Sequence, residues 1–293
     1  MDFLGLIDSR PVVVGDGAMG TRLFERGLGP GECGELWNLD RPDDVEDVLR
    51  SYVGAGADFV LTNTFGASGL ALARHGLRER LAEVNRAAVE IARRAAGGRA
   101  LVVGDLGPGG SLLEPYGDVT EAQVRASFEP QVEALAAAGV DALICETFDS
   151  SAELRIVLEV VRRRTDLPAI ACMKFTPERS GRFRTIMGEG PDALVEASRD
   201  CGCAVVGTNC GQGSETMSRL VAELAGLSDL PIMVEPNAGL PRLVGGRTVY
   251  PEDAETFAGR LPGLYQAGAR IIGGCCGTTP DHIRAIRRLA DSL

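Results

Sequence analysis

Residues 271–280 read IIGGCCGTTP, a stretch that joins an apolar run, a glycine-flanked cysteine pair and a helix start. Thr279 and Pro280 have the order of an N-cap followed by the first helical residue, where the missing N–H of proline costs nothing. Cys275 and Cys276 are therefore predicted to lie between the carboxyl end of a buried strand and a helix. The flanking glycines relax the backbone, so both sulfurs can turn toward one point.

The same order of strand, loop and helix recurs along the whole chain. Apolar runs of strand length alternate with longer segments whose apolar residues recur at helical spacing. Several runs are continuous rather than alternating, which is typical of parallel strands covered on both faces. The runs occupy residues 12–14, 59–61, 101–103, 142–145, 169–173, 204–206, 232–234 and 270–272.

These eight units predict an α/β protein with a single (β/α)8 TIM barrel, one domain over residues 1–293. A weak repeat (GAGADFVL, AAGVDALI, DCGCAVVG, QAGARIIG) supports the count, because each copy places glycine at a helix end before a strand. A doubly wound open sheet stays an alternative, since pattern alone does not separate the two. In a barrel, the stretches after the strands share one rim, where active sites lie.

Charge and composition exclude several classes of partner. The net charge of −11 argues against binding to nucleic acid or to an anionic membrane surface. No apolar run approaches the roughly 20 residues that span a bilayer, and the N-terminus lacks the features of a signal peptide, so a cytoplasmic protein is expected. The eight cysteines are then expected as thiols, ligands or catalysts rather than disulfides. With only two histidines, transition-metal chemistry would have to rely on sulfur.

A third cysteine, Cys210, ends another apolar run, in AVVGTNCGQG. Together with Cys275 and Cys276 it predicts a zinc site with three thiolate ligands and one open position. Such a site suits alkyl transfer to a substrate sulfur, because coordination deprotonates a thiol that is largely protonated at neutral pH. Core packing or redox chemistry are the alternatives for these three thiols. The other cysteines are predicted to be buried structural residues: Cys33, Cys145, Cys172, Cys201 and Cys203.

Two acids end predicted strands on the same rim. Asp16 and Glu146 are interpreted as binding a substrate ammonium group, with helix capping, an ion pair or general acid–base work as alternatives. The backbone N–H groups of Gly17 and Ala18 are predicted to hold a small carboxylate, with the Thr62 hydroxyl as a further partner.

Three more polar residues lie at predicted strand or helix ends. Asn237 is a hypothetical ligand for the open metal position in the absence of substrate, or else a turn residue. Asp105, between Gly104 and Gly107, is interpreted as structural. His282 is interpreted as an ordinary surface or capping residue.

The pieces GDGAMGT, TNTF, ET, TNCG, EPNAGLP and IIGGCCGTTPDHI, in this order across nearly the whole chain, resemble the zinc-dependent homocysteine S-methyltransferases. The last two pieces resemble the homocysteine-binding module of cobalamin-dependent methionine synthase. The resemblance implies a barrel that holds one Zn²⁺ through Cys210, Cys275 and Cys276. It also implies homocysteine bound to that zinc through sulfur, with Asp16 and Glu146 facing its amino group.

The methyl donor is not indicated directly. The betaine-dependent branch carries caging tyrosines where this chain has Gly66 and Thr147, which argues against betaine. The chain has no room for folate- or cobalamin-binding domains. The expected donor is therefore methylcobalamin on a separate corrinoid protein, a methyl-folate system supplied in trans, or a small sulfonium compound. Methylation of another thiol, a corrinoid demethylation pathway, and a non-catalytic zinc or redox thiol protein are the alternative functions.

Overall fold

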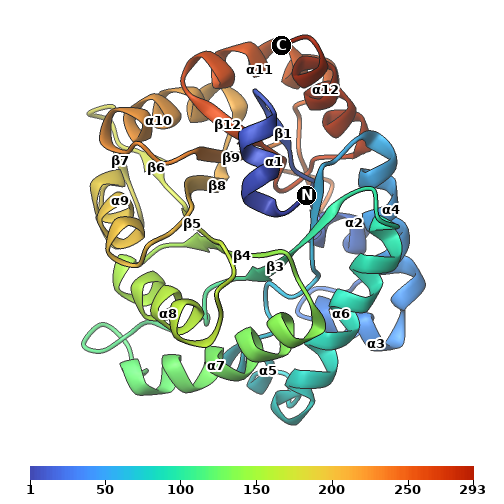
Figure 1. The fold of residues 1–293 in the computed structure, drawn as a ribbon, viewed down its shortest axis with the longest axis vertical. Coiled ribbons are helices and arrows are strands. Elements are labelled where there is room, and N and C mark those ends of the chain that lie inside the picture. The colour runs from blue at the N-terminus through green and yellow to red at the C-terminus, as the bar shows by residue number, and fades with distance from the viewer.

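Eight parallel strands form one sheet that curves into a nearly closed barrel (Figure 1), in the order β1-β12-β9-β8-β5-β4-β3-β2. The structure is a computed structural model that describes residues 1–293, apart from the side chain of Arg247. The predicted single (β/α)8 barrel is confirmed, and the doubly wound sheet is excluded. The barrel strands are β1 (Val13–Val14), β2 (Phe59–Leu61), β3 (Leu101–Leu106), β4 (Ala142–Phe148), β5 (Ala169–Met173), β8 (Val205–Gly213), β9 (Ile232–Asn237) and β12 (Ala269–Ile272).

A ring of helices surrounds the strands, one long helix after each strand. In chain order they are α4 (Pro42–Ala55), α6 (Leu81–Ala96), α7 (Glu121–Ala138), α8 (Ser151–Arg164), α9 (Pro191–Asp200), α10 (Ser214–Leu227), α11 (Ala254–Gln266) and α12 (Pro280–Asp291). Shorter helices α2 (Gly20–Glu25), α3 (Trp37–Asp40) and α5 (Gly69–Ala73), with 3-10 turns Gly34–Leu36 and Arg78–Arg80, lie in the first two connections.

The strands are apolar on both faces because each face is covered. Their outward side chains pack against the helix ring, as Val14 and Val60 do. The inward side chains form a separate cluster to which every strand contributes one residue or more, so the barrel interior is filled rather than hollow. Its central members are Val13, Phe59, Val103, Ile144, Ile170, Val205, Met233 and Ile271.

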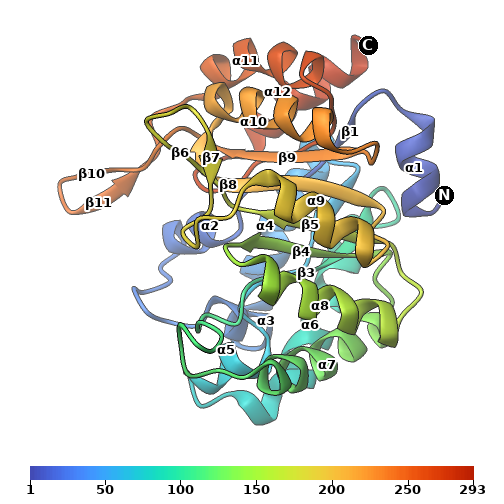
Figure 2. The same ribbon diagram turned by 90° about the vertical axis from the view of Figure 1, so that its left-hand side faces the viewer.

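Helix α1 (Phe3–Ser9) closes the end of the barrel where the strands begin (Figures 1 and 2). Phe3, Leu6 and Ile7 are buried and belong to the interior cluster. The Phe3 ring meets the Phe59 ring edge-on, with centroids 5.9 Å apart. Access to the barrel is therefore confined to the opposite rim.

The two ends of the sheet, β1 and β2, meet at a seam that carboxylates join. Asp58 accepts the N–H of Val14 at 2.8 Å, and Asp16 accepts the N–H of Leu61 at 2.9 Å. Asp58 also pairs with Arg10 and, at 3.0 Å, with Arg287. One backbone bond, from the Asp58 N–H to the Val14 carbonyl at 2.7 Å, also crosses the seam. Side chains supply the other seam contacts, where the remaining strand pairs use continuous backbone pairing.

Two hairpins that the sequence did not predict rise from the long connections of the open rim. They are β6 (Thr176–Pro177) with β7 (Phe183–Arg184), and β10 (Arg242–Val244) with β11 (Arg247–Val249). The second projects away from the barrel, at the end opposite α1 (Figure 2). Among the described residues, no helix combines the length and apolar character needed to cross a bilayer.

Candidate active site

Three thiols meet at the open rim of the barrel. The Sγ atoms of Cys210 and Cys276 are 3.9 Å apart, as are those of Cys275 and Cys276. All three sulfurs lie within 4.8 Å of one another, and all three residues are half-buried. The sequence-predicted trio is therefore brought together, whereas the five remaining cysteines are buried elsewhere.

Cys210 reaches the trio through a bulge in β8. The register between β8 and β9 shifts between Asn209 and Gly213, which frees the intervening residues from regular pairing. Cys210 adopts a left-handed φ of 58°, and Gly211 follows at 73°. A non-glycine residue in this region is uncommon and costs energy, so the surrounding structure imposes it. The sequence carried no sign of the bulge, because the predicted strand ended at residue 206.

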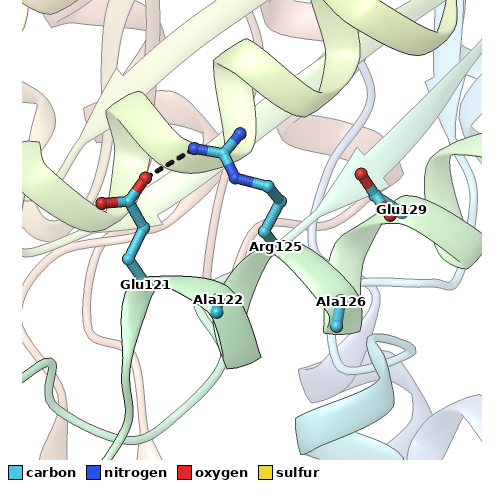
Figure 3. Close-up of a pocket in the computed structure, with 5 residues that line it drawn as sticks. All are labelled: Glu121, Ala122, Arg125, Ala126 and Glu129. Carbon is cyan, nitrogen blue, oxygen red and sulfur yellow. Dashed lines mark hydrogen bonds and ion pairs between the residues drawn. The ribbon is translucent and has the colours of Figure 1, made fainter.

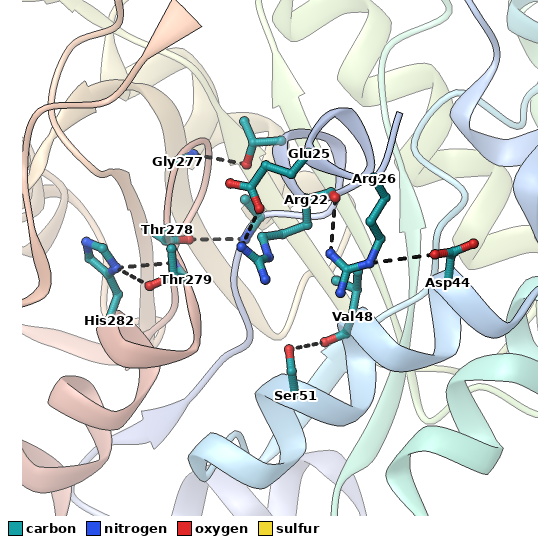
Figure 4. Close-up of polar contacts among 12 residues, drawn as sticks. Arg22, Glu25, Arg26, Asp44, Val48, Ser51, Gly277, Thr278, Thr279 and His282 are labelled. Atoms are coloured by element: carbon teal, nitrogen blue, oxygen red, sulfur yellow. Dashed lines mark hydrogen bonds and ion pairs between the residues drawn. The ribbon is translucent and has the colours of Figure 1, made fainter. Parts of the chain in front are cut away.

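The cysteine pair is positioned by the start of α12. Thr279 and His282 form a reciprocal capping box, with Pro280 in the first turn (Figure 4). The predicted N-cap is confirmed. His282 is a capping residue as expected, but it is buried rather than on the surface. Its Nε2 lies 3.1 Å from the backbone oxygen of Glu252.

Hydrogen bonds tie the cysteine loop to the first connection of the barrel. The Gly277 N–H donates to Thr21 Oγ1 at 3.3 Å (Figure 4), and the Ala18 N–H donates to Thr278 Oγ1 at 3.1 Å. A Cβ at Gly17 would lie 2.7 Å from the Tyr52 ring, so only glycine fits there. The two loops that border the site are thus packed directly on each other.

The free thiols share protons unequally. Hydrogen bonds from the Cys210 and Cys275 thiols lower the pKa of Cys276 to about 3. The same contacts, together with burial, raise the pKa of Cys275 well above its ordinary value. One thiolate is therefore stabilised by two thiols, and a bound cation would release the remaining protons.

A cavity of about 60 Å³ lies beside the thiols, and four carboxyl groups line it. Asp16 and Glu146, the predicted ammonium ligands, are both there. Asp105 and Glu235 join them, and each has one buried oxygen without a hydrogen-bond partner. The cavity is further lined by Gly17, Ala18, Met19, Leu61, Thr62, Gly274 and Cys275.

Burial dominates the electrostatics of this cluster. It raises the pKa of Asp16, Asp105 and Glu235 well above their ordinary values, and the charge of Glu146 raises each of them further. Burial also raises the pKa of Glu146 to about 7. Four carboxyl groups cannot all ionise in such a small space unless a cation joins them. Without a cation, the cluster therefore retains protons to higher pH than isolated carboxyl groups would.

Asp105 and Glu235 are the residues that sequence reasoning missed. Asp105 was interpreted as structural because glycines flank it, yet it faces the same cavity as Asp16. Glu235 follows the apolar part of β9 in the way that Glu146 follows that of β4. That shared place at a strand end was the signal by which Glu235 could have been found.

The three residues of the predicted carboxylate site, Gly17, Ala18 and Thr62, all line the cavity, and two of them already have hydrogen-bond partners for their donors. The Ala18 N–H already donates to Thr278 Oγ1 at 3.1 Å. The Thr62 hydroxyl has its one hydrogen directed to Thr64, since the Thr64 hydroxyl is itself committed to the Asp105 carbonyl at 2.7 Å. Among the described residues, the Gly17 N–H has no hydrogen-bond partner and stays the candidate donor.

Asn237 is the last residue of β9, which lies between β8, the strand of Cys210, and β12, the strand that precedes the cysteine pair. It is buried, and its Oδ1 has no hydrogen-bond partner. Its carbonyl also accepts the N–H of Gly239 at 2.8 Å, as a turn residue would. Both readings of this residue therefore stay open.

A larger hollow of about 410 Å³ lies on the surface of α7 and is lined by none of the thiols (Figure 3). Its charged groups pair with each other or with α8, as Arg125 does with Glu121 at 2.6 Å and Glu159 at 2.9 Å. Size alone would favour this hollow, but it contains no convergent reactive groups. We therefore place the active site at the smaller cavity.

Comparisons with known proteins agree with this geometry. A family model described as "Homocysteine S-methyltransferase" matches residues 13–290. The chain is 33% identical over 303 residues to methionine synthase of Mycobacterium tuberculosis, covering 97% of this chain and 25% of that protein. Methionine synthase of Mycobacterium leprae is also 33% identical, over 291 residues, with 94% and 24% covered. The chain thus spans about a quarter of the length of these relatives.

Solved structures extend the comparison. The metallated form of the homocysteine methyltransferase MmuM from Escherichia coli superposes with a TM-score of 0.80 at 29% identity, covering 97% of this chain and 98% of that one. The carboxyl transferase domain of Rhizobium etli pyruvate carboxylase, at 12% identity and a TM-score of 0.56, shares the fold alone. The resemblance seen in the sequence is confirmed: the chain belongs to the homocysteine S-methyltransferase family.

Proposed function

We propose that this methyltransferase transfers a methyl group to the thiol of homocysteine and so forms methionine. One observation carries the proposal. A single cavity has the thiol trio at one side, through Cys275, and the unpaired carboxyl oxygens of Asp105 and Glu235 within it. A molecule with a sulfur atom and an ammonium group complements both parts.

We propose zinc as the metal that the three cysteines hold. Tetrahedral coordination with Zn–S bonds of about 2.3 Å places sulfurs about 3.8 Å apart. Two of the three sulfur separations, at 3.9 Å, match this geometry, and the third lies within 4.8 Å. When bound, zinc lowers the pKa of a coordinated thiol, so that the acceptor is a thiolate at neutral pH.

The side chains of the cavity then orient the acceptor. Asp16 and Glu146 face its ammonium group, whose N–H donors also satisfy the buried carboxyl oxygens of Asp105 and Glu235. The Gly17 N–H is the proposed donor to its carboxylate. The acceptor sulfur attacks the methyl carbon in line, the bond from that carbon to the donor breaks, and its electron pair leaves with the donor. We further propose Asn237 Oδ1 as the occupant of the open metal position before the acceptor arrives.

The proposed methyl donor is supplied by another protein. The proposal is supported by the 33% identity to two methionine synthases and by the open rim, which leaves the thiol trio accessible from one side. A methylated corrinoid protein or a methyl-folate system in trans is the proposed partner.

A donor screen with metal analysis tests the proposal. Anaerobically purified protein is incubated with homocysteine and, in turn, methylcobalamin, methyl-folate with a corrinoid protein, S-methylmethionine and betaine. We expect about one zinc per chain and methionine from at least one donor other than betaine. Cys275→Ala should lose both metal and turnover, because two thiolates do not complete the site.

Cys203→Ala is the matched control, since Cys203 is a buried cysteine at the opposite end of the barrel. It should keep full metal content. Full activity of Cys275→Ala without zinc would contradict the metal role. Methionine formation absent with every donor would contradict the proposed reaction.

A further inference from the structure

Asn209 precedes the thiol-bearing residue Cys210 in the chain, but its side chain bonds to Glu146, one of the carboxyl groups of the cavity. It is fully buried, and its Nδ2 donates to Glu146 Oε2 at 2.6 Å. The same Nδ2 donates to Thr147 Oγ1 at 2.7 Å, while Oδ1 accepts the Thr147 N–H at 2.8 Å. The orientation of the amide is unambiguous, because a carboxylate only accepts and a backbone N–H only donates.

This side chain joins two irregular strand ends. The register of β4 against β5 shifts between Cys145 and Phe148, as the register of β8 against β9 shifts after Asn209. Thr147 in the first bulge and Cys210 in the second are the two non-glycine residues with a left-handed φ, at 62° and 58°. Strained residues of this kind persist only where their surroundings hold them. The three bonds of Asn209 connect both.

The order of the strands explains why a side chain is needed. In the sheet β4 and β8 lie on either side of β5, so the backbones of β4 and β8 do not pair with each other. The Asn209 amide therefore supplies the direct polar link between the Glu146–Thr147 bulge and the Cys210 bulge.

We propose that Asn209 is a positioning residue that holds the Glu146 carboxylate in register with the sulfur of Cys210, so that one acceptor molecule meets both. The inference rests on the proposed function, in which Glu146 faces the acceptor's ammonium group. Loss of the link should weaken the binding of acceptors that carry an ammonium group. The binding of acceptors that lack this group should not change.

The test uses the full chain with cobalt(II) in place of zinc and needs no methyl donor. Homocysteine and 4-mercaptobutyrate, the same carbon chain without the amino group, are titrated while the thiolate-to-cobalt absorption is followed. The variant is Asn209→Asp, which keeps the size of the side chain but turns the donor facing Glu146 into an acceptor. Asn209→Ala is measured as well, because it removes the same hydrogen bonds without introducing a new carboxyl group next to Glu146.

We expect both variants to bind one cobalt per chain. Their Kd for homocysteine should rise about tenfold or more, since the lost bond reaches a charged group, while the Kd for 4-mercaptobutyrate changes less than about threefold. Asn85→Asp is the matched control: Asn85 is a fully buried amide bonded to the carbonyls of Ala67 and Leu81, outside the cavity. It should leave the preference between the two ligands unchanged.

The outcomes separate the two proposals. Wild-type protein that binds both ligands equally would overturn the ammonium role of the cavity, and the inference with it. A wild-type preference for homocysteine that Asn209→Asp and Asn209→Ala retain would overturn the inference alone. An equal rise in the Kd of both ligands in the variants would also overturn the inference, because such a rise would show that Asn209 has a general structural role.

Discussion

At the scale of single residues, Glu146 connects protonation, folding and substrate binding. Burial raises the pKa of its carboxyl group from 4.5 to about 7, so the folded protein keeps this proton over a range in which the unfolded chain has lost it. A raised pKa in the folded state stabilises the fold below the unfolded value, and this stability is lost as the pH rises through the folded value.

We therefore expect Glu146→Gln to be as stable as the wild type near pH 4.5 and more stable near pH 7, by about 3 kcal/mol at most. Glutamine mimics the protonated acid and has no charge to lose. Urea unfolding of both proteins between pH 4.5 and 8 measures the difference. A difference that stays constant with pH would contradict the raised pKa. The same variant should bind homocysteine more weakly with its metal content unchanged.

The thiol trio was predictable because glycine-flanked cysteines at strand ends leave few other places for their sulfurs. The hydrogen bonds around it were not. The Ala18 N–H is taken by Thr278, 260 residues away in the chain, and the hydroxyl of Thr62 is taken by Thr64. Such distant or competing partners decide which hydrogen-bond donors are free for a substrate. The spacing of residues within a motif does not predict these partners.

At the scale of elements, α1 stabilises the barrel from its closed end. Phe3 is fully buried against the interior cluster, whereas Leu4, the next residue of the same helix, is 46% exposed. We expect Phe3→Ala to lower the free energy of unfolding by about 3–5 kcal/mol, the usual cost of removing a buried phenylalanine side chain.

Leu4→Ala is the control within the same helix and should change stability by less than about 0.5 kcal/mol. Urea denaturation measures both variants, and zinc content should be normal in both because the thiols lie at the other end of the barrel. A small effect of Phe3→Ala would mean that α1 is not part of the core.

The sequence predicted the positions of the barrel strands more accurately than the residues at which these strands end. The runs of Val, Ile and Leu marked all eight barrel strands because both faces are buried. The bulged ends of β4 and β8 extend beyond those runs through Glu146 and Cys210, where polar residues and cysteine replace the apolar pattern. The two rim hairpins were missed for the same reason, since neither contributes a continuous apolar run.

At the scale of the whole molecule, closure of the barrel depends on Asp58. Its carboxylate accepts the Val14 N–H across the seam and pairs with Arg10 and Arg287. Asp141 is the counterpart between β3 and β4, where it accepts the Val102 N–H at 2.7 Å and pairs with Arg93. The difference is that β3 and β4 are also paired along residues 103–106, whereas the seam has the single backbone bond from the Asp58 N–H to the Val14 carbonyl.

Asp58→Ala should therefore cost more stability than Asp141→Ala, about 3 kcal/mol against about 1 kcal/mol. The side chain of Asp58 is 8% exposed and that of Asp141 is 24% exposed, which favours the same order. Urea denaturation of the two variants side by side measures the comparison. Equal costs would show that the seam needs no carboxylate.

The filled interior and the helix that stops one end of the barrel have a kinetic consequence. In the proposed reaction, acceptor and donor enter by the same mouth, and the carboxyl-lined cavity receives the acceptor's amino group inside the rim. A bulky donor seated over that mouth would block the way in. In the reaction proposed above, homocysteine therefore binds before the donor, and methionine leaves after the demethylated donor.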